Sequence, residues 1–140
     1  MIAFVVLGIP APQGSKQAFV RGKRAVLVEM SKALPRWRAA VTEAARAEHD
    51  GPPLDGPLAV WITFYLPRPK SVPARRRPYP TVTPDLDKLA RAVLDGITDA
   101  RLWTDDARVV DLTITKRYQD PPVACAPGAV VHITSKEDPS

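Results

Sequence analysis

Residues 58–66, with the sequence LAVWITFYL, are the most strand-like stretch of the chain. Apolar, aromatic or β-branched side chains fill nearly every position, which predicts a central strand of the sheet. On this reading Trp61 belongs to the core, as does Trp37 in the helix predicted for residues 31–49.

The chain has 140 residues, 45% of them hydrophobic and 25% charged. These proportions predict one soluble globular domain over residues 1–140.

The segments before this strand predict a strand, a hairpin and a helix. Residues 2–8 end at a Gly- and Pro-containing stop and read as a strand. Residues 13–30 read as an irregular hairpin, with short strands at Gln17–Val20 and Ala25–Val28. Residues 31–49 have apolar side chains at helical spacing, with Ser31 as the expected N-cap.

The segments after it predict a long loop, a helix and two strands. Residues 67–84 hold six prolines and form a loop rather than regular structure. Residues 85–99 carry apolar side chains at spacings of three and four, which is typical of an amphipathic helix. Strands follow at 107–117 and 129–135, and residues 136–140 form a polar flexible tail. The expected fold class is α/β (α+β): a single small domain with a mixed β-sheet and two main helices packed on it.

Charge is divided unevenly along the chain. Residues 1–84 hold 13 Lys and Arg against 5 Asp and Glu, a balance of +8, whereas residues 85–140 hold 7 against 10, a balance of −3. Such a division favours a polyanionic partner bound beside a carboxylate site. A base-composition bias of the genome would explain the abundance of Arg equally well.

Several site classes are excluded. The single cysteine, Cys125, allows neither an internal disulfide nor a cysteine zinc cage, and His49 and His132 are too far apart for a zinc pair. No apolar run approaches the roughly 18 residues of a membrane span. With no signal peptide evident at the N-terminus, the expected location is the cytoplasm.

Aspartates are concentrated in one part of the chain. Seven of the 15 acidic residues lie between 85 and 111, and all seven are Asp. Short carboxylates suit hard divalent cations. The five cations of the loop 67–84 come directly before Asp85, as a metal site acting on a phosphate requires. We expect the connection 100–106 to reverse direction and return Asp105 and Asp106 to the start of the helix.

Purely structural roles would also explain these aspartates. Asp85 after Pro84 makes a good helix N-cap, and Asp87 in the first turn favours the helix dipole. Asp105 and Asp106 suit a turn. Arg91, four residues after Asp87, could form a surface ion pair or contact a phosphate.

The segment from Asp85-Leu86-Asp87-Lys88-Leu89 through Trp103-Thr104-Asp105-Asp106 to Val109 resembles the RusA family of Holliday-junction resolvases. The opening Pro12-Gln13-Gly14-Ser15-Lys16 is similar to the start of family members. The resemblance implies a homodimeric crossover junction endodeoxyribonuclease of recombination and repair. It also implies a Mg²⁺ cofactor, with Mn²⁺ as an alternative, paired nicks in four-way DNA junctions, and a phage or prophage setting.

The resemblance also assigns roles to residues. Asp85, Asp87 and Asp106 are expected to be catalytic and to bind the metal. Arg91 is expected to be catalytic where the family has Lys, and Lys88 stands where the family usually has Asn. The expected DNA-binding residues are Lys16, Arg68, Lys70, Arg75, Arg76, Arg77 and Lys88, with Arg21, Lys23 and Arg24 extending the footprint.

Two aromatic residues near this region are expected to pack. Packing is favoured over base stacking for Tyr79 and over DNA contact for Trp103.

Two other functions stay open: a non-catalytic junction- or DNA-binding protein, and a nuclease that acts on flaps or forks.

Overall fold

The computed structural model describes residues 1–14, 24–121 and 126–137, with the backbone alone described for 24–32. The strands are β1 (Ile2–Leu7), β2 (Leu58–Leu66), β3 (Val109–Tyr118) and β4 (Gly128–Ser135). The helices are α1 (Arg24–Glu48), α2 (Leu86–Asp99) and a short 3₁₀ helix, η1 (Asp106–Arg108).

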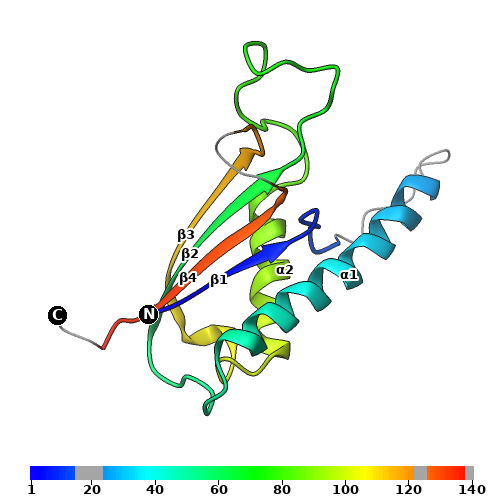
Figure 1. Cartoon of the computed structure of the whole chain (residues 1–140). Coiled ribbons are helices and arrows are strands. Elements are labelled where there is room, and N and C mark those ends of the chain that lie inside the picture. Colours follow the sequence, from blue (N-terminus) through cyan, green and yellow to red (C-terminus); the bar gives the residue numbers. More distant parts are fainter. Residues whose placement is uncertain (15–23, 122–125, 138–140) are drawn as a thin grey trace.

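The strands form one mixed sheet in the order β1-β4-β2-β3. β4 is antiparallel to both β1 and β2, whereas β3 is parallel to β2. The parallel pair is connected through α2, which runs back along the sheet between the end of β2 and the start of β3. Both α1 and α2 lie on the same face of the sheet (Figure 1). The predicted fold class is confirmed.

The core lies between the sheet and the two helices. Alternate residues of β2 are buried, and they meet Leu89, Val93 and Ile97 of α2. Trp37 of α1 and Trp103 after α2 are also buried, as predicted. The indole Nε1 of Trp103 donates to Thr98 Oγ1 at 2.7 Å, so the ring packs without losing its hydrogen bond.

The other face of the sheet has no helix over it among the described residues. Trp61 is 41% exposed there, so the prediction that it belongs to the core is wrong. Val5 and Leu7 of β1 are exposed on the same face. The continuous apolar run of β2 resembled a strand covered on both sides, but the two helices cover only the even-numbered positions of β2.

The predicted hairpin at 13–30 is wrong in its second half. α1 begins at Arg24, so Ala25–Val28 is helical, Arg24 is not a turn residue, and Ser31 lies inside the helix rather than at its N-cap. Val26 and Val28 suggested a strand, but the surrounding Ala, Leu, Glu and Met favour helix. Gln17–Val20 lies outside the described residues.

Gly96 is the point of closest approach between α1 and α2. A Cβ atom built on Gly96 would lie 2.8 Å from Val41 Cγ1, closer than real contacts allow. Thr42 Oγ1 donates to the Gly96 carbonyl oxygen at 2.8 Å and closes the same contact. This contact sets where α2, and therefore its N-terminus, lies on the sheet.

We expect Gly96→Ala to lower the free energy of unfolding by about 1–3 kcal/mol, because the methyl group forces the helices apart. Urea denaturation of both proteins measures the difference. Gly14→Ala is the matched control, since nothing lies within 4 Å of a Cβ there and no comparable loss is expected. Equal stability of Gly96→Ala and the unaltered protein would show that the helices can separate freely.

Candidate functional site

Asp85 occupies the N-cap position of α2, at the point where the loop 67–84 ends. Its backbone is extended, as the prediction of an N-cap requires, but its side chain makes no capping hydrogen bond. The carboxylate side chain is 54% exposed, and Oδ2 lies 3.6 Å from Lys88 Nζ. Its position therefore fits capping while its carboxylate oxygens stay available for a ligand.

Asp87 and Arg91 lie on the first two turns of α2 and are both exposed. Neither side chain makes a hydrogen bond or an ion pair with another residue that the structure describes. The surface ion pair that would have explained Arg91 is therefore not formed, and both charges face solvent near Asp85.

The neighbouring aspartates Asp105 and Asp106 do different things. Asp105 is the N-cap of η1, where its Oδ1 accepts from the backbone N–H of Ala107 at 2.7 Å. This is the turn role that the sequence left open. Asp106 is exposed, and its carboxylate has no partner within the described part of the chain. Only Asp106 of this pair is free to bind a ligand.

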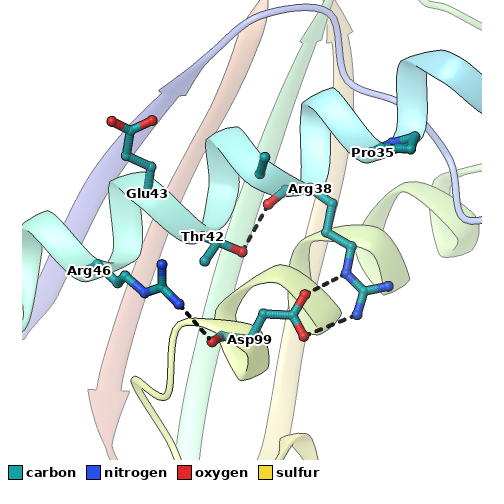
Figure 2. A pocket seen from close by; sticks show the side chains of 7 residues that line it. Pro35, Arg38, Thr42, Glu43, Arg46 and Asp99 are labelled. Carbon is teal, nitrogen blue, oxygen red and sulfur yellow. Dashed lines mark hydrogen bonds and ion pairs between the residues drawn. The ribbon is translucent and has the colours of Figure 1, made fainter.

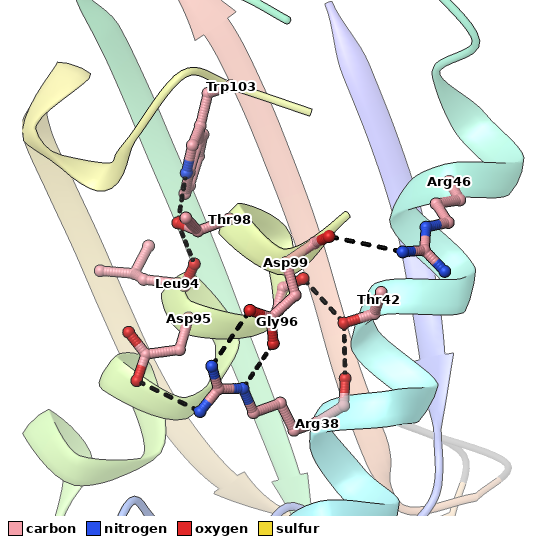
Figure 3. A network of polar contacts seen from close by, with 9 residues as sticks. All are labelled: Arg38, Thr42, Arg46, Leu94, Asp95, Gly96, Thr98, Asp99 and Trp103. Carbon is pink, nitrogen blue, oxygen red and sulfur yellow. Dashed lines mark hydrogen bonds and ion pairs between the residues drawn. The ribbon is translucent and has the colours of Figure 1, made fainter. Parts of the chain in front are cut away.

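The remaining aspartates of the run also have partners. Arg38 of α1 forms a bidentate salt bridge with Asp99: Nε donates to Oδ2 at 2.6 Å, and Nη2 donates to Oδ1 at 3.1 Å. Arg38 Nη1 also lies 3.9 Å from Asp95, and Asp111 pairs with Lys136 at 3.6 Å. The hydrogen bond from Arg38 lowers the pKa of Asp99. Figure 3 shows how the contacts of Arg38 with Asp95 and Asp99 hold α1 against α2. Of the seven aspartates, Asp87 and Asp106 have no side-chain partner in the described part of the chain, and Asp85 pairs only with Lys88, three residues along the same helix.

These three aspartates do not meet within one chain. α2 has 14 residues, which at a rise of about 1.5 Å per residue gives a length of roughly 21 Å. Asp85 precedes the start of α2 and Asp106 follows its end, so the two lie at opposite ends of the helix (Figure 1). Across the described ranges, no group of three His, Cys, Asp or Glu side chains is close enough to share a metal ion.

The connection 100–106 does reverse direction, but at the far end of α2. Leu54 pairs with Trp103, and Asp55 accepts from Thr104 and Arg108, which fixes this connection beside the entrance to β2. β3 then carries the chain back toward the loop. The expectation that the reversal would bring Asp106 to the start of α2 is therefore wrong. The chain reaches that end of α2 only after the ten residues of β3, and Asp106 lies before β3.

Lys116 lies near the end of β3 and holds the residues before Asp85. Its Nζ donates to the carbonyl oxygens of Val82 at 2.8 Å and Pro84 at 2.9 Å. The sequence analysis missed this residue. The available signal was that Lys116 and Arg108, at the two ends of the predicted strand, are the charged residues on its Val110, Leu112, Ile114 side.

The segment that leads from β1 to Gly14 also reaches α2. The backbone N–H of Gln13 donates to the Lys88 carbonyl oxygen at 3.0 Å, which places this segment on the first turn of α2. Gln13 Oε1 is buried without a hydrogen-bond partner among the described residues. Lys16, predicted to bind DNA, lies outside the described residues, as do Arg21 and Lys23.

The cations of the loop 67–84 fall into two groups. Lys70, Arg75 and Arg76 are exposed and have no hydrogen-bond or ion-pair partner in the described ranges. Arg68 and Arg77 are half-buried, and Arg77 Nη1 donates to Tyr118 Oη at 3.0 Å. The loop extends beyond the ends of β2 and β3 on the side where α2 begins (Figure 1). Its exposed charges therefore lie at the Asp85 end of the molecule.

Tyr79, in the same loop, is 60% exposed, so the expectation that it packs is wrong. Base stacking, the alternative that the sequence left open, is compatible with this placement.

A cavity of about 630 Å³ lies elsewhere. It is an open depression between α1 and the end of α2, where Arg38, Arg46 and Asp99 bind one another (Figure 2). Because Arg38, Arg46 and Asp99 already bind one another there, this cavity is a contact between the helices rather than a second site.

Comparisons with known proteins agree with the motifs. Residues 10–126 match the protein family described as Endodeoxyribonuclease RusA. A protein of Bacillus subtilis (strain 168), named "Uncharacterized protein YqaN", is 29% identical over 132 residues, which cover 86% of this chain and 90% of that protein. No helix within the described ranges is long and apolar enough to cross a membrane.

Proposed function

Because this chain belongs to the RusA endodeoxyribonuclease family, we propose that it is a metal-dependent nuclease that resolves four-way (Holliday) DNA junctions by paired nicks. The observation that carries the proposal is the exposure of three aspartates. Asp87 and Asp106 have no side-chain partner among the described residues, Asp85 contacts only the neighbouring Lys88, and exposed cations of the loop 67–84 lie at the same end of α2 as Asp85 and Asp87.

A divalent ion, Mg²⁺ or Mn²⁺, is the cofactor that these carboxylates suit. When bound, it would activate a water molecule and offset the negative charge that develops on the phosphate. Asp85, Asp87 and Asp106 would hold it, and the free guanidinium of Arg91, one to two turns into α2, would bind the phosphate. Lys88, half-buried and 3.6 Å from Asp85, would balance the carboxylate charge before metal and DNA arrive.

One chain does not fit this metal, because its oxygen ligands must all lie within about 2.0–2.6 Å of the ion. Carboxylates at the two ends of α2 cannot do this. We therefore infer that each site takes Asp85 and Asp87 from one copy and Asp106 from a second copy. A two-fold dimer then contains two such sites, which is the number that paired nicks require.

β3 is the surface that we propose for this dimer. It is a ten-residue edge strand, and Val110 and Leu112 on it are 62% and 40% exposed. Long exposed edge strands tend to pair with another strand. Antiparallel pairing of two β3 strands would bring the start of one, next to Asp106, to the end of the other. At that end Lys116 holds Pro84, the neighbour of Asp85.

Leu112→Glu should therefore convert the dimer to a monomer, because two buried charges would face each other across the two-fold axis. Light scattering should give about twice 15.3 kDa for the unaltered protein and 15.3 kDa for the variant. Leu7→Glu is the matched control on the open sheet face, where Leu7 is 69% exposed. Loss of the dimer in Leu7→Glu but not in Leu112→Glu would assign the partner to the sheet face instead.

Replacement of Arg75 and Arg76 by Ala should weaken junction binding and its dependence on salt. Each lost phosphate contact lowers the slope of log K against log salt by about 0.9 on duplex DNA. Gel shifts in EDTA over a salt series measure this slope. Arg36→Ala, an exposed arginine on α1, is the control. An unchanged slope in the double variant would remove the loop from the DNA-binding surface.

The proposed activity is tested with labelled four-way junctions, forks, flaps and duplexes, each with Mg²⁺ and with EDTA. We expect metal-dependent nicks in two opposing strands of the junction and little cleavage of the duplex. Preferential cleavage of flaps or forks would replace junction resolution with the alternative nuclease function. Binding without cleavage under every metal condition would favour a non-catalytic DNA-binding protein.

A further inference from the structure

We propose that Arg68 is a positioning residue: with Asp120 and Tyr118 it forms a lock that holds the loop 67–84 in one shape and presents Arg75 and Arg76 to DNA. We refer to these three residues as the Arg68 lock. The part of this inference that concerns DNA rests on the proposed function. The part that concerns the shape of the loop does not.

The guanidinium of Arg68 uses its whole donor capacity inside the protein. Nε and Nη2 donate to the two carboxylate oxygens of Asp120, each at 2.8 Å. Nη1 donates to the carbonyl oxygens of Arg77 at 2.6 Å and Val72 at 3.3 Å, and Nη2 donates to that of Pro78 at 3.4 Å. An arginine has five N–H donors, so none remains for a phosphate. The side chain is only 13% exposed.

Tyr118 completes the lock at the end of β3. The guanidinium of Arg68 lies 4.0 Å from the centre of the Tyr118 ring, a cation–π contact. The phenol oxygen of Tyr118 also accepts from Arg77. Since Tyr118 is the last residue of β3 and Asp120 follows two residues later, the lock fastens the loop to a rigid element.

The lock closes the loop around its exposed arginines. Arg68 lies at the beginning of the loop, and the carbonyls that it binds at residues 77 and 78 lie beyond Arg75 and Arg76. Between them the N–H groups of Arg76 and Arg77 donate to the Pro73 carbonyl, which forms a single helical turn. This turn carries Arg75 and Arg76 on its outside. A loop ordered before binding loses less conformational entropy when it meets DNA.

The charges of the lock reinforce each other. The hydrogen bond from Arg68 lowers the pKa of Asp120, and the same contact raises the pKa of Arg68. The pair thus stays ionised at neutral pH. Lysine could keep the charge but not the geometry, because an ammonium has three donors and no planar fork.

Two variants separate a lock from a phosphate ligand. Arg68→Lys preserves the charge, so a simple phosphate contact would survive, whereas the lock would open. Asp120→Ala removes a negative charge, so simple electrostatics would strengthen DNA binding, whereas an open lock would weaken it. We expect both variants to bind a four-way junction in EDTA roughly 2- to 10-fold more weakly than the unaltered protein. Glu43→Gln, which removes an exposed acid on α1, is the charge control.

A second readout needs no DNA. Trypsin can cleave after Lys70, Arg75 and Arg76, and the closed loop should resist it. We expect faster cleavage at these positions in Arg68→Lys and Asp120→Ala, and an unchanged rate in Glu43→Gln. Thermal melts of each variant confirm that the domain remains folded.

Three outcomes would overturn the inference: unchanged trypsin cleavage in both lock variants, tighter junction binding by Asp120→Ala, or full binding by Arg68→Lys. If trypsin cleaves the lock variants faster but the unaltered protein binds no DNA, the proposed function fails. The Arg68 lock would then still order the loop 67–84, without a role in DNA binding.

Discussion

Asp85→Asn, Asp87→Asn and Asp106→Asn should each reduce the rate of junction nicking by about 10²–10⁴-fold, because a metal supplies several kcal/mol of charge stabilisation and each 1.4 kcal/mol is about tenfold in rate. The amide keeps the size of the carboxylate but removes the charge that holds the ion. Nicking assays under single-turnover conditions measure the loss directly.

The same variants should keep their stability and their affinity for DNA. The Asp85 side chain makes no capping hydrogen bond, and Asp87 and Asp106 have no side-chain partner in the described part of the chain. Each free energy of unfolding should therefore change by no more than about 0.5 kcal/mol. Junction binding in EDTA should be equal or tighter, because neutral side chains no longer repel phosphates.

Glu43→Gln is the charge control for these variants. Glu43 is an exposed acid on α1, outside both the aspartate cluster and the proposed dimer strand. Its variant should nick at the normal rate. Full nicking activity in Asp85→Asn and Asp106→Asn would falsify the metal assignment, and the basic loop would then indicate a DNA-binding protein.

The sequence predicted those elements whose pattern is local. β2 has the predicted bounds, Leu58–Leu66, because β-branched and aromatic residues fill it without interruption. α2 begins one residue after the predicted start, since the spacing of Leu89, Val93 and Ile97 allows only a helix. Trp103 was also placed correctly in the core.

Other features depend on contacts between distant residues. The exposure of Trp61 follows from both helices lying on one face, which no local pattern reveals. Sequence reasoning counted Arg68 among the DNA-binding cations because its charge resembles that of Arg75. Its partner Asp120 lies 52 residues away, beyond a helix and a strand.

For the clustered aspartates, the sequence predicted which residues are free but not where they lie relative to one another. Motif resemblance selected Asp106 over Asp105, and the structure supplies a physical reason, since Asp105 caps η1. Spacing could not show that Asp106 lies at the opposite end of α2 from Asp85. That separation depends on the direction in which β3 leaves the connection.

The most direct test of a site shared between two copies is a mixture of two inactive variants. If Asp85→Asn and Asp106→Asn chains are refolded together, about half of the dimers should be heterodimers by random assortment. In a heterodimer one site contains both altered residues, and the other combines an intact Asp85 and Asp87 with an intact Asp106. A quarter of all sites in the mixture are then intact, so the nicking rate should return to about a quarter of that of the unaltered protein.

Asp85→Asn mixed with Asp87→Asn is the control, because every site in that heterodimer lacks one carboxylate. The measurement is the nicking rate of heterodimers purified through two different affinity tags. The account predicts recovery in the first mixture, confined to one strand of each junction, and none in the control. Purified Asp85→Asn and Asp106→Asn heterodimers that remain as inactive as their parents would contradict it.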